Sequence, residues 1–216
     1  MRASSAGSGL AAAMVASLLA CGPAWASTVR TWHFDVFLDE RRIGAHEFTI
    51  TADAAGEIAQ VAADFNVRVL FLDLYRYKHR NLERWQGPCL HAVDATTDDN
   101  GETSRVQARR SGDGLQVEAA QGSQVFEGCV MSFAYWNPRI LQATHLFNPQ
   151  TGELAAVEIE ALGPQTIQVR GAPALAERYR LRGEKFAIDL WYSPQGDWLR
   201  LEADAAGERR LRYELR

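Results

Sequence analysis

The sequence lacks the motifs that identify common classes of enzyme. It contains no Gly-x-Ser-x-Gly nucleophile motif, no His-Glu-x-x-His zinc motif, no phosphate-binding loop and no dinucleotide-binding glycine pattern. It also has no excess of positive charge, because 23 basic residues stand against 27 acidic ones, for a net charge of −4. These absences lower the expectation of an enzyme without excluding one, and we expect no nucleic-acid partner.

Long apolar segments, internal repeats and low-complexity linkers are also missing. Beyond the N-terminal region, no apolar run approaches the roughly 18 residues that a membrane-spanning helix requires, so we predict no transmembrane helix. The 216 residues, 47% hydrophobic and 23% charged, suit a folded domain with a substantial core. We therefore predict one β-barrel-like domain over residues 27–216.

The N-terminal 26 residues are typical of a secretory signal peptide. One basic residue, Arg2, precedes an apolar run at residues 10–20, and Ala24-Trp25-Ala26 is a small-x-small cleavage site. We predict cleavage after Ala26 and export to the periplasm or beyond. The alternative is a lipoprotein, since the four residues ending at Cys21 resemble a lipobox whose cysteine would be lipidated.

Cysteine usage fits an exported protein. Cleavage after Ala26 would remove Cys21 and leave Cys89 and Cys129, which we predict to form a disulfide in an oxidising compartment. The 40-position separation predicts about 4 kcal/mol of stabilisation from loop closure. No histidine lies at ligand spacing from either cysteine, so we predict no metal site there and no cofactor.

Alternating apolar and polar residues recur in about a dozen short segments separated by turns. This pattern predicts an all-β fold, an antiparallel meander curled into a barrel or half-barrel with at most one or two short helices. The expected helix covers residues 139–145, with Asn137 as its cap and Pro138 at its first position. The first strand, residues 32–39, and the last, residues 209–215, are natural partners for closing the sheet.

Two hairpins have registers that the side chains predict. In the first, a loop at residues 40–42 places Trp32 opposite Ile50 and Val36 opposite His46, which directs His46 inward. In the second, a Ser-Pro-Gln-Gly turn at residues 193–196 joins two strands in which Tyr192 faces Asp197, Trp191 faces Trp198 and Asp189 faces Arg200. The core face of this hairpin is expected to contain Phe186, Ile188, Leu190, Leu199 and Leu201.

A strictly alternating strand at residues 75–85 carries the strongest candidate for chemistry. The face predicted to point inward consists of Tyr75, Tyr77, His79, Asn81, Glu83 and Trp85. His46, His79 and Glu83 could then form a site for general acid and base catalysis. A polar layer whose groups satisfy one another is the alternative, and we favour it. A metal site is the weaker interpretation of the same three side chains.

Aromatic and basic residues indicate possible contact surfaces. The aromatic candidates for ligand binding are Tyr75, Tyr77, Trp136, Trp191 and Trp198. The alternative is that a loop or the short helix covers the indoles. A basic stripe, defined as Arg76, Lys78, Arg80 and Arg84, suits contact with the anionic surface of a membrane, although such rows more often form a solvated face that discourages edge pairing.

Several segments together resemble an uncharacterised family of secreted bacterial β-rich proteins, classed as a domain of unknown function. They are residues 43–48 (Ile-Gly-Ala-His-Glu-Phe), the Tyr-x-Tyr-x-His strand ending in Glu83-Arg84-Trp85, Trp136-Asn137-Pro138, residues 148–152 (Asn-Pro-Gln-Thr-Gly) and residues 191–196 (Trp-Tyr-Ser-Pro-Gln-Gly). Family members carry Asp more often than Ser after the Trp-Tyr pair, so Ser193 departs from the pattern. The resemblance covers nearly the whole chain after the signal, and it implies secretion and a β-rich fold but no particular activity.

Three hypotheses about function follow from these patterns. The favoured one is an exported envelope protein that binds a lipid or other hydrophobic small molecule inside a β-barrel. The second is an envelope enzyme with an inward site at His46, His79 and Glu83. The third is a scaffold that binds other envelope proteins through a face containing Trp191 and Trp198.

Overall fold

The structure is a computed structural model that describes residues 27–69, 72–205 and 207–216. The predicted signal peptide, including Cys21 and the residues up to Ala26, lies outside the described residues, as do residues 70, 71 and 206. No helix in the described ranges is long and apolar enough to cross a membrane.

The described ranges contain fifteen strands and one short 3-10 helix. In chain order these are Thr28–Leu38 (β1), Arg41–Asp53 (β2), Gly56–Val69 (β3), Leu72–Gln86 (β4), Cys89–Asp99 (β5), Glu102–Ser111 (β6), Gly114–Ala119 (β7), Gly122–Glu127 (β8), Pro138–Gln142 (η1), His145–Phe147 (β9), Leu154–Ala156 (β10), Glu158–Val169 (β11), Ala172–Arg182 (β12), Ala187–Tyr192 (β13), Trp198–Ala205 (β14) and Arg209–Leu215 (β15). The side chain of Asn137 caps η1 by accepting a hydrogen bond from the Arg139 amide at 3.1 Å, as predicted. The helix ends at Gln142, three residues before its predicted end.

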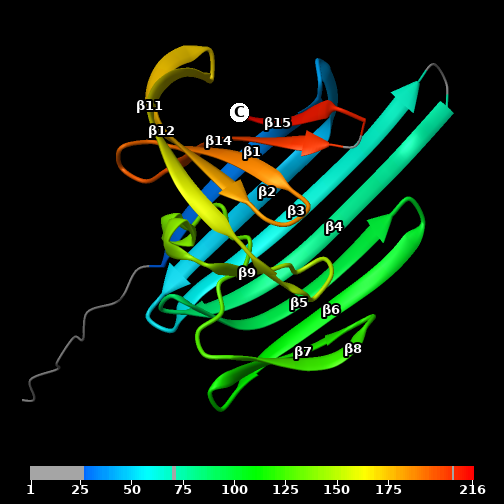
Figure 1. The fold of residues 1–216 in the computed structure, drawn as a ribbon, viewed down its shortest axis with the longest axis vertical. Coiled ribbons are helices and arrows are strands. Elements are labelled where there is room, and N and C mark those ends of the chain that lie inside the picture. Colours follow the sequence, from blue (N-terminus) through cyan, green and yellow to red (C-terminus); the bar gives the residue numbers. More distant parts are fainter. Residues whose placement is uncertain (1–26, 70–71, 206) are drawn as a thin grey trace, which may run out of the picture.

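Thirteen of these strands form one antiparallel sheet in the order β11-β12-β13-β14-β15-β1-β2-β3-β4-β5-β6-β7-β8. The first and last strands of the chain, β1 and β15, pair as predicted. The sheet nevertheless stays open, because β8 and β11 are its two edges, and the fold is a half-barrel rather than a closed barrel. Figure 1 shows the strongly curled sheet, with β9 crossing in front of it.

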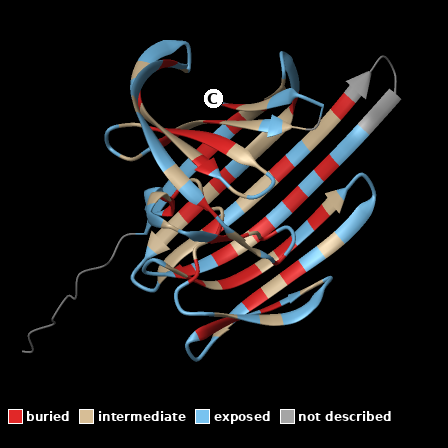
Figure 2. Ribbon diagram, viewed as in Figure 1, coloured by how far each residue is buried: buried red, intermediate tan, exposed pale blue. Residues whose placement is uncertain are grey.

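Burial follows the two-residue period of the strands. Buried and exposed residues alternate along β4, β5 and β6 in Figure 2, as expected for strands with one face on a core and one on solvent. The core joins the inner faces of the sheet to the segment 128–157 between the two edge strands, which contributes Trp136, Ile140, Leu146 and Phe147. We call this segment the covering segment, because it packs on the inner face.

The β1–β2 hairpin corrects the first predicted register by two residues. Phe34 lies opposite His46 and Val36 opposite Gly44, and the register shifts between Val36 and Phe37. The turn is a tight one at residues 39–40, where Asp39 has a φ of +56°. A two-residue shift keeps each side chain on its face of the sheet, so His46 still faces inward as predicted.

The β13–β14 hairpin corrects the second register more severely. Tyr192 pairs with Trp198 while Trp191 pairs with Arg200, so Leu199 is an extra residue in β14. This bulge places Trp198, which is 0% exposed, in the main core and Leu199 on the outer face beside Trp191. The prediction that the two indoles face each other is therefore wrong, as is the placement of Leu199 in the core.

The same shift overturns the predicted pairing of Asp189. This residue lies opposite Glu202 rather than Arg200. Its carboxylate instead accepts hydrogen bonds from Arg180 and Arg178 of the neighbouring β12, at distances of 2.5–2.7 Å. The buried charge on the outer face is thus compensated by two guanidinium groups.

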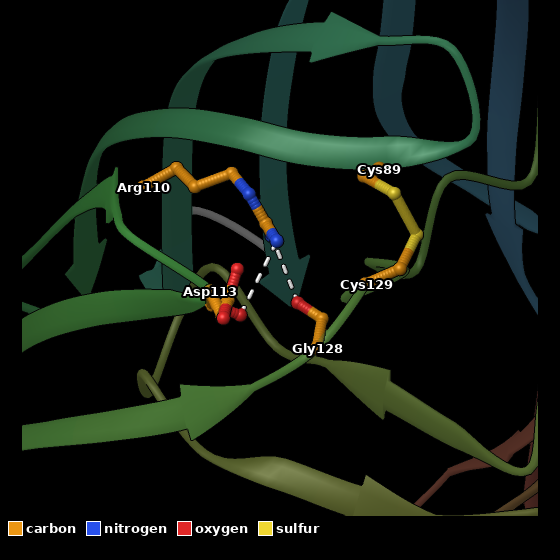
Figure 3. Close-up of a disulfide and its surroundings, with 5 residues drawn as sticks. All are labelled: Cys89, Arg110, Asp113, Gly128 and Cys129. Atoms are coloured by element: carbon orange, nitrogen blue, oxygen red, sulfur yellow. Dashed lines mark hydrogen bonds between the residues drawn. A yellow bond between two sulfur atoms is a disulfide. The ribbon is translucent and has the colours of Figure 1, made fainter.

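A disulfide fastens the covering segment to the sheet. Cys89, at the start of β5, is bonded to Cys129, with a Cα–Cα distance of 5.0 Å. Beside it, the Arg110 side chain donates hydrogen bonds to the carbonyl oxygens of Gly128, at 2.8 Å, and Asp113, at 3.2 Å (Figure 3). The predicted disulfide is therefore present, and it holds the beginning of the covering segment against β5.

Candidate functional site

Strand β4 places a row of polar and aromatic side chains on the inner face of the half-barrel. Tyr77, His79, Asn81, Glu83 and Trp85 are all at most 9% exposed. The predicted inward face of this strand is therefore correct over these five positions, because the chain alternates regularly there. The result is a polar strip inside an otherwise apolar interior.

His46 joins this strip from two strands away. His46 on β2 lies opposite Ala63 on β3, and Ala63 lies opposite His79 on β4. Ala63 is 1% exposed, so the two histidines lie on either side of it on the same inner face of the sheet. The fold therefore brings His46, His79 and Glu83 to one inner wall, as predicted.

Glu83 is almost completely enclosed within the strip, with an exposed fraction of 2%. Its side chain accepts hydrogen bonds from Asn81 Nδ2 at Oε1 and from Trp85 Nε1 at Oε2, each at 3.0 Å. Burial raises the pKa of the Glu83 carboxyl, and these hydrogen bonds oppose the shift without cancelling it. Both oxygens are therefore occupied by protein donors, in an environment that favours the neutral form.

Both histidines of the strip favour the neutral form. Burial, together with the neighbouring Arg80 charge, lowers the pKa of His79 to about 4, and its Nδ1 lies 2.9 Å from the Thr97 hydroxyl. Burial and the proximity of His79 lower the pKa of His46 to about 3, and its Nδ1 lies 3.1 Å from the Tyr213 hydroxyl. Near neutral pH both imidazoles of the strip are therefore uncharged.

The covering segment closes this region from the other side. The Trp136 ring meets Trp85 edge-on at a centroid distance of 5.8 Å, and the Tyr135 ring lies 5.4 Å from that of Trp198. The Tyr135 carbonyl oxygen accepts a 2.7 Å hydrogen bond from the Tyr192 hydroxyl. Aromatic contacts and a hydrogen bond from a side chain to the backbone therefore help to hold the segment above the strip.

Two adjoining cavities remain between the sheet and the covering segment. The first, which we call the polar pocket, has a volume of about 220 Å³, and its wall includes His46, His79, Asn81, Glu83 and Trp136. The second, which we call the apolar cavity, has a volume of about 650 Å³. Four residues line both spaces: His46, Tyr135, Gln150 and Ile188. The two cavities therefore adjoin at these shared walls.

Aromatic and aliphatic side chains dominate the apolar cavity. They come from both ends of the chain, since β2, β3 and β4 form one wall and β14 and β15 another. The apolar and aromatic lining consists of Leu38, Ile43, Phe65, Val67, Tyr75, Tyr77, Tyr135, Ile188, Leu201, Ala203, Ala205, Leu211 and Tyr213. Arg209 also lines the cavity, and its guanidinium donates to the Asp39 carboxylate at 3.1 Å.

The five aromatic residues predicted to bind a ligand separate into two groups. Tyr75 and Tyr77 line the apolar cavity, and Trp136 lines the polar pocket. Trp198 is fully buried, and its Nε1 donates to the Arg200 carbonyl oxygen at 3.0 Å. Trp191 packs on the outer face between the guanidinium groups of Arg178 and Arg200, which lie 5.2 and 5.5 Å from its ring centroid. The two indoles of the β13–β14 hairpin thus stand apart from the cavity walls.

Sequence reasoning missed several residues that line the cavities. Gln150 lies in the covering segment, where no alternating pattern predicts which way a side chain points. Tyr213 lies on the last strand, and the predicted pairing of the first and last strands could have brought it near His46.

Two of the four side chains of the basic stripe form ion pairs with acidic residues on neighbouring strands. Arg80 Nη2 lies 2.6 Å from Asp64 Oδ2, and Arg76 Nη2 lies 3.4 Å from Asp98 Oδ2. These exposed ion pairs contribute little stability, but they reduce the net charge of this outer face. The arrangement fits the solvated-face interpretation of the stripe.

No group of three or more His, Cys, Asp or Glu side chains in the described ranges has the arrangement of a metal site. In the polar strip, both Glu83 oxygens already accept hydrogen bonds from neighbouring side chains.

Comparison with known proteins places this architecture in a wider context. A similar solved structure is the crystal structure of a β-barrel-like protein of the domain of unknown function DUF1849 from Brucella abortus. The TM-score is 0.64 at 9% sequence identity, and the match covers 86% of this chain and 94% of that one. At this identity the likeness concerns the fold alone.

No curated protein matches the chain. Residues 34–216 match the domain of unknown function DUF6134, and the chain therefore belongs to that family.

Proposed function

We propose that the protein is an exported binding protein that holds a lipid or another hydrophobic small molecule inside its half-barrel. The observation that carries this proposal is the apolar cavity of about 650 Å³. Its volume lies within the range of roughly 300–1,000 Å³ that is typical of small-molecule sites.

The composition of the cavity wall supports the proposal. A space of this size on the inner face of a curled sheet is large enough to take up most of a small molecule. Small side chains at Ala203 and Ala205 help to create it, and mostly apolar and aromatic side chains surround it. Such walls favour an aliphatic or aromatic ligand, whose transfer from water contributes favourable free energy.

Catalysis at the polar strip has weaker support. A general acid or base needs a polar atom that can reach the substrate. His46 Nε2 has no hydrogen-bond partner, but burial and His79 lower the pKa of His46 to about 3, which makes this imidazole a weak base. His79 Nδ1 lies 2.9 Å from Thr97 Oγ1, and both Glu83 oxygens accept hydrogen bonds from neighbouring side chains. These contacts favour a polar layer that shapes a binding site.

Export is a second part of the proposal. It rests on the signal-like residues 1–26 and gains support from the Cys89–Cys129 disulfide, since such bonds persist in oxidising compartments. Under this proposal the mature chain begins at Ser27 and works in the bacterial envelope.

Equilibrium binding of labelled fatty acids and phospholipids, and of the uncharged hydrophobic probe N-phenyl-1-naphthylamine, tests the proposal. We expect saturable binding to the mature protein, and at least tenfold weaker binding to Ala203→Trp, because the indole would occupy the cavity. The matched control is Ala172→Trp, which places the same side chain at an exposed position and should bind like the wild type. Circular dichroism establishes that both variants are folded. Absence of binding to the wild type, or equal binding to both variants, would contradict the proposal.

A further inference from the structure

Unsatisfied polar atoms gather at the polar pocket. Among the described residues, eight buried side-chain nitrogen or oxygen atoms have no hydrogen-bond partner. Three of these atoms, His46 Nε2, Asn81 Oδ1 and Trp136 Nε1, belong to residues that line the polar pocket. Each unpaired buried group destabilises the fold, so three around one small space indicate a place where a ligand completes the hydrogen bonding.

The chemistry of these atoms defines what they can bind. The indole nitrogen of Trp136 is a donor only, whereas Asn81 Oδ1 is an acceptor, with the amide nitrogen of Asn81 donating to Glu83. His46 Nε2 accepts when Nδ1 carries the proton and donates in the other tautomer. A complementary group must therefore both donate and accept, as a primary amide or a hydroxyl group does.

The wall of the pocket offers little compensation for a formal charge. No Lys or Arg side chain is among the described residues that line it. Burial lowers the pKa values of His46 and His79 to about 3 and about 4, so neither imidazole supplies a positive charge near neutral pH. Each oxygen of the Glu83 carboxyl, whose pKa burial raises, already accepts a hydrogen bond from a neighbouring side chain. An ionised head group would lose its hydration without gaining a partner charge. Arg209, on the wall of the apolar cavity, is already paired with Asp39.

The position of the pocket gives the ligand an orientation. His46, Tyr135, Gln150 and Ile188 are walls of both cavities, so a molecule in the apolar cavity can extend one end toward the polar strip. A terminal polar group would then reach the unpaired atoms while the hydrocarbon stays among apolar side chains.

From this arrangement, and resting on the proposed function, we infer a narrower ligand class. The ligand is an aliphatic molecule whose uncharged hydrogen-bonding end, an amide or a hydroxyl group, lies at His46, Asn81 and Trp136. Its chain lies in the apolar cavity. An ionised fatty acid or an alkylammonium ion binds less well.

A displacement series on the mature protein tests this selectivity. The uncharged fluorescent probe N-phenyl-1-naphthylamine is first bound and then displaced at pH 8 by four ligands that share one chain: dodecanamide, dodecanol, dodecanoate and dodecyltrimethylammonium, each below its micelle concentration. We expect dodecanamide and dodecanol to have dissociation constants at least tenfold lower than those of the two charged ligands.

Two variants locate the selectivity. Trp136→Phe removes the indole donor but keeps an aromatic ring. We expect it to reduce the preference for dodecanamide over the two charged ligands to less than threefold. Trp191→Phe makes the same change on the outer face and should leave the preference as in the wild type.

Each outcome of the series has a distinct meaning. Equal displacement by all four ligands would overturn the inference about the polar end while leaving a hydrophobic binding protein. Preference for dodecanoate or dodecyltrimethylammonium would overturn it as well, and would indicate a charged site. If neither the probe nor any of the ligands binds, the proposed function fails and this inference fails with it.

Discussion

The buried imidazole of His79 should make the stability of the protein fall in mild acid. His79 is 3% exposed, and burial lowers its pKa to about 4, whereas a histidine in an unfolded chain titrates near pH 6.5. Below about pH 6.5 the unfolded chain therefore binds a proton that the native protein does not bind. The stability associated with the neutral imidazole is present above pH 6.5 and is lost as the pH falls toward 4.

The size of this effect follows from the two pKa values. At pH 5, protonation of the unfolded state lowers the free energy of unfolding by about 2 kcal/mol for a histidine that stays neutral in the native state. Glu83 contributes with the opposite sign, because its folded pKa is raised and the stability it confers is lost as the pH rises. Comparing two proteins that both contain Glu83 removes that contribution to a first approximation.

Urea unfolding, monitored by tryptophan fluorescence, measures how the free energy of unfolding of each protein changes with pH. Wild type and His79→Asn are each unfolded at pH 7.5 and at pH 5. Between these two pH values, we expect the free energy of unfolding to fall by about 2 kcal/mol more in the wild type than in the variant. His33→Asn is the matched control, since His33 is exposed on β1 and the substitution should change stability by less than about 0.5 kcal/mol. If His79→Asn loses as much stability as the wild type, the burial argument for His79 is wrong.

Other substitutions test separate parts of the fold. Replacing Cys89 and Cys129 by Ser should lower the free energy of unfolding by about 4 kcal/mol, measured by urea unfolding, because the disulfide closes a loop of 40 positions; a loss below 1 kcal/mol would contradict this. Glu83→Gln should cost about 1–3 kcal/mol at pH 7, since an amide cannot accept hydrogen bonds at both terminal atoms; an unchanged thermal midpoint would refute the described contacts. Gly44→Ala should destabilise by about 1–3 kcal/mol or more, because the added Cβ would lie 1.9 Å from the Asp64 carbonyl oxygen, and a wild-type midpoint would show that β2 and β3 do not approach so closely.

Regular strands made part of the site predictable from the sequence. Between Tyr77 and Glu83 the side chains of β4 alternate without a bulge, so the two-residue period, with the aromatic face taken as the inner one, was enough to predict which of them face inward. His46 also faces inward as predicted, although its register was wrong by two residues, because a shift of two preserves the face.

Bulges and irregular segments were not predictable in this way. At the β13–β14 hairpin, one extra residue at Leu199 moves Trp198 to the core and separates it from Trp191. Apolar side chains occur at positions 198, 199 and 201, so the sequence pattern cannot distinguish the bulged strand from the regular one. The covering segment lacks alternation, and the contribution of Tyr135 and Gln150 to the cavities depends on tertiary contacts.

The central claim is that the apolar cavity holds a hydrophobic molecule in the cell. Its most direct test is organic extraction and mass spectrometry of the mature protein, purified under native conditions from the bacterial periplasm, alongside Ala203→Trp purified in the same way. We predict that the wild type releases a lipid or other aliphatic compound in roughly equimolar amount and that the cavity-filled variant releases far less. Extracts of the two proteins that contain no such compound, or equal traces of it, would contradict the claim.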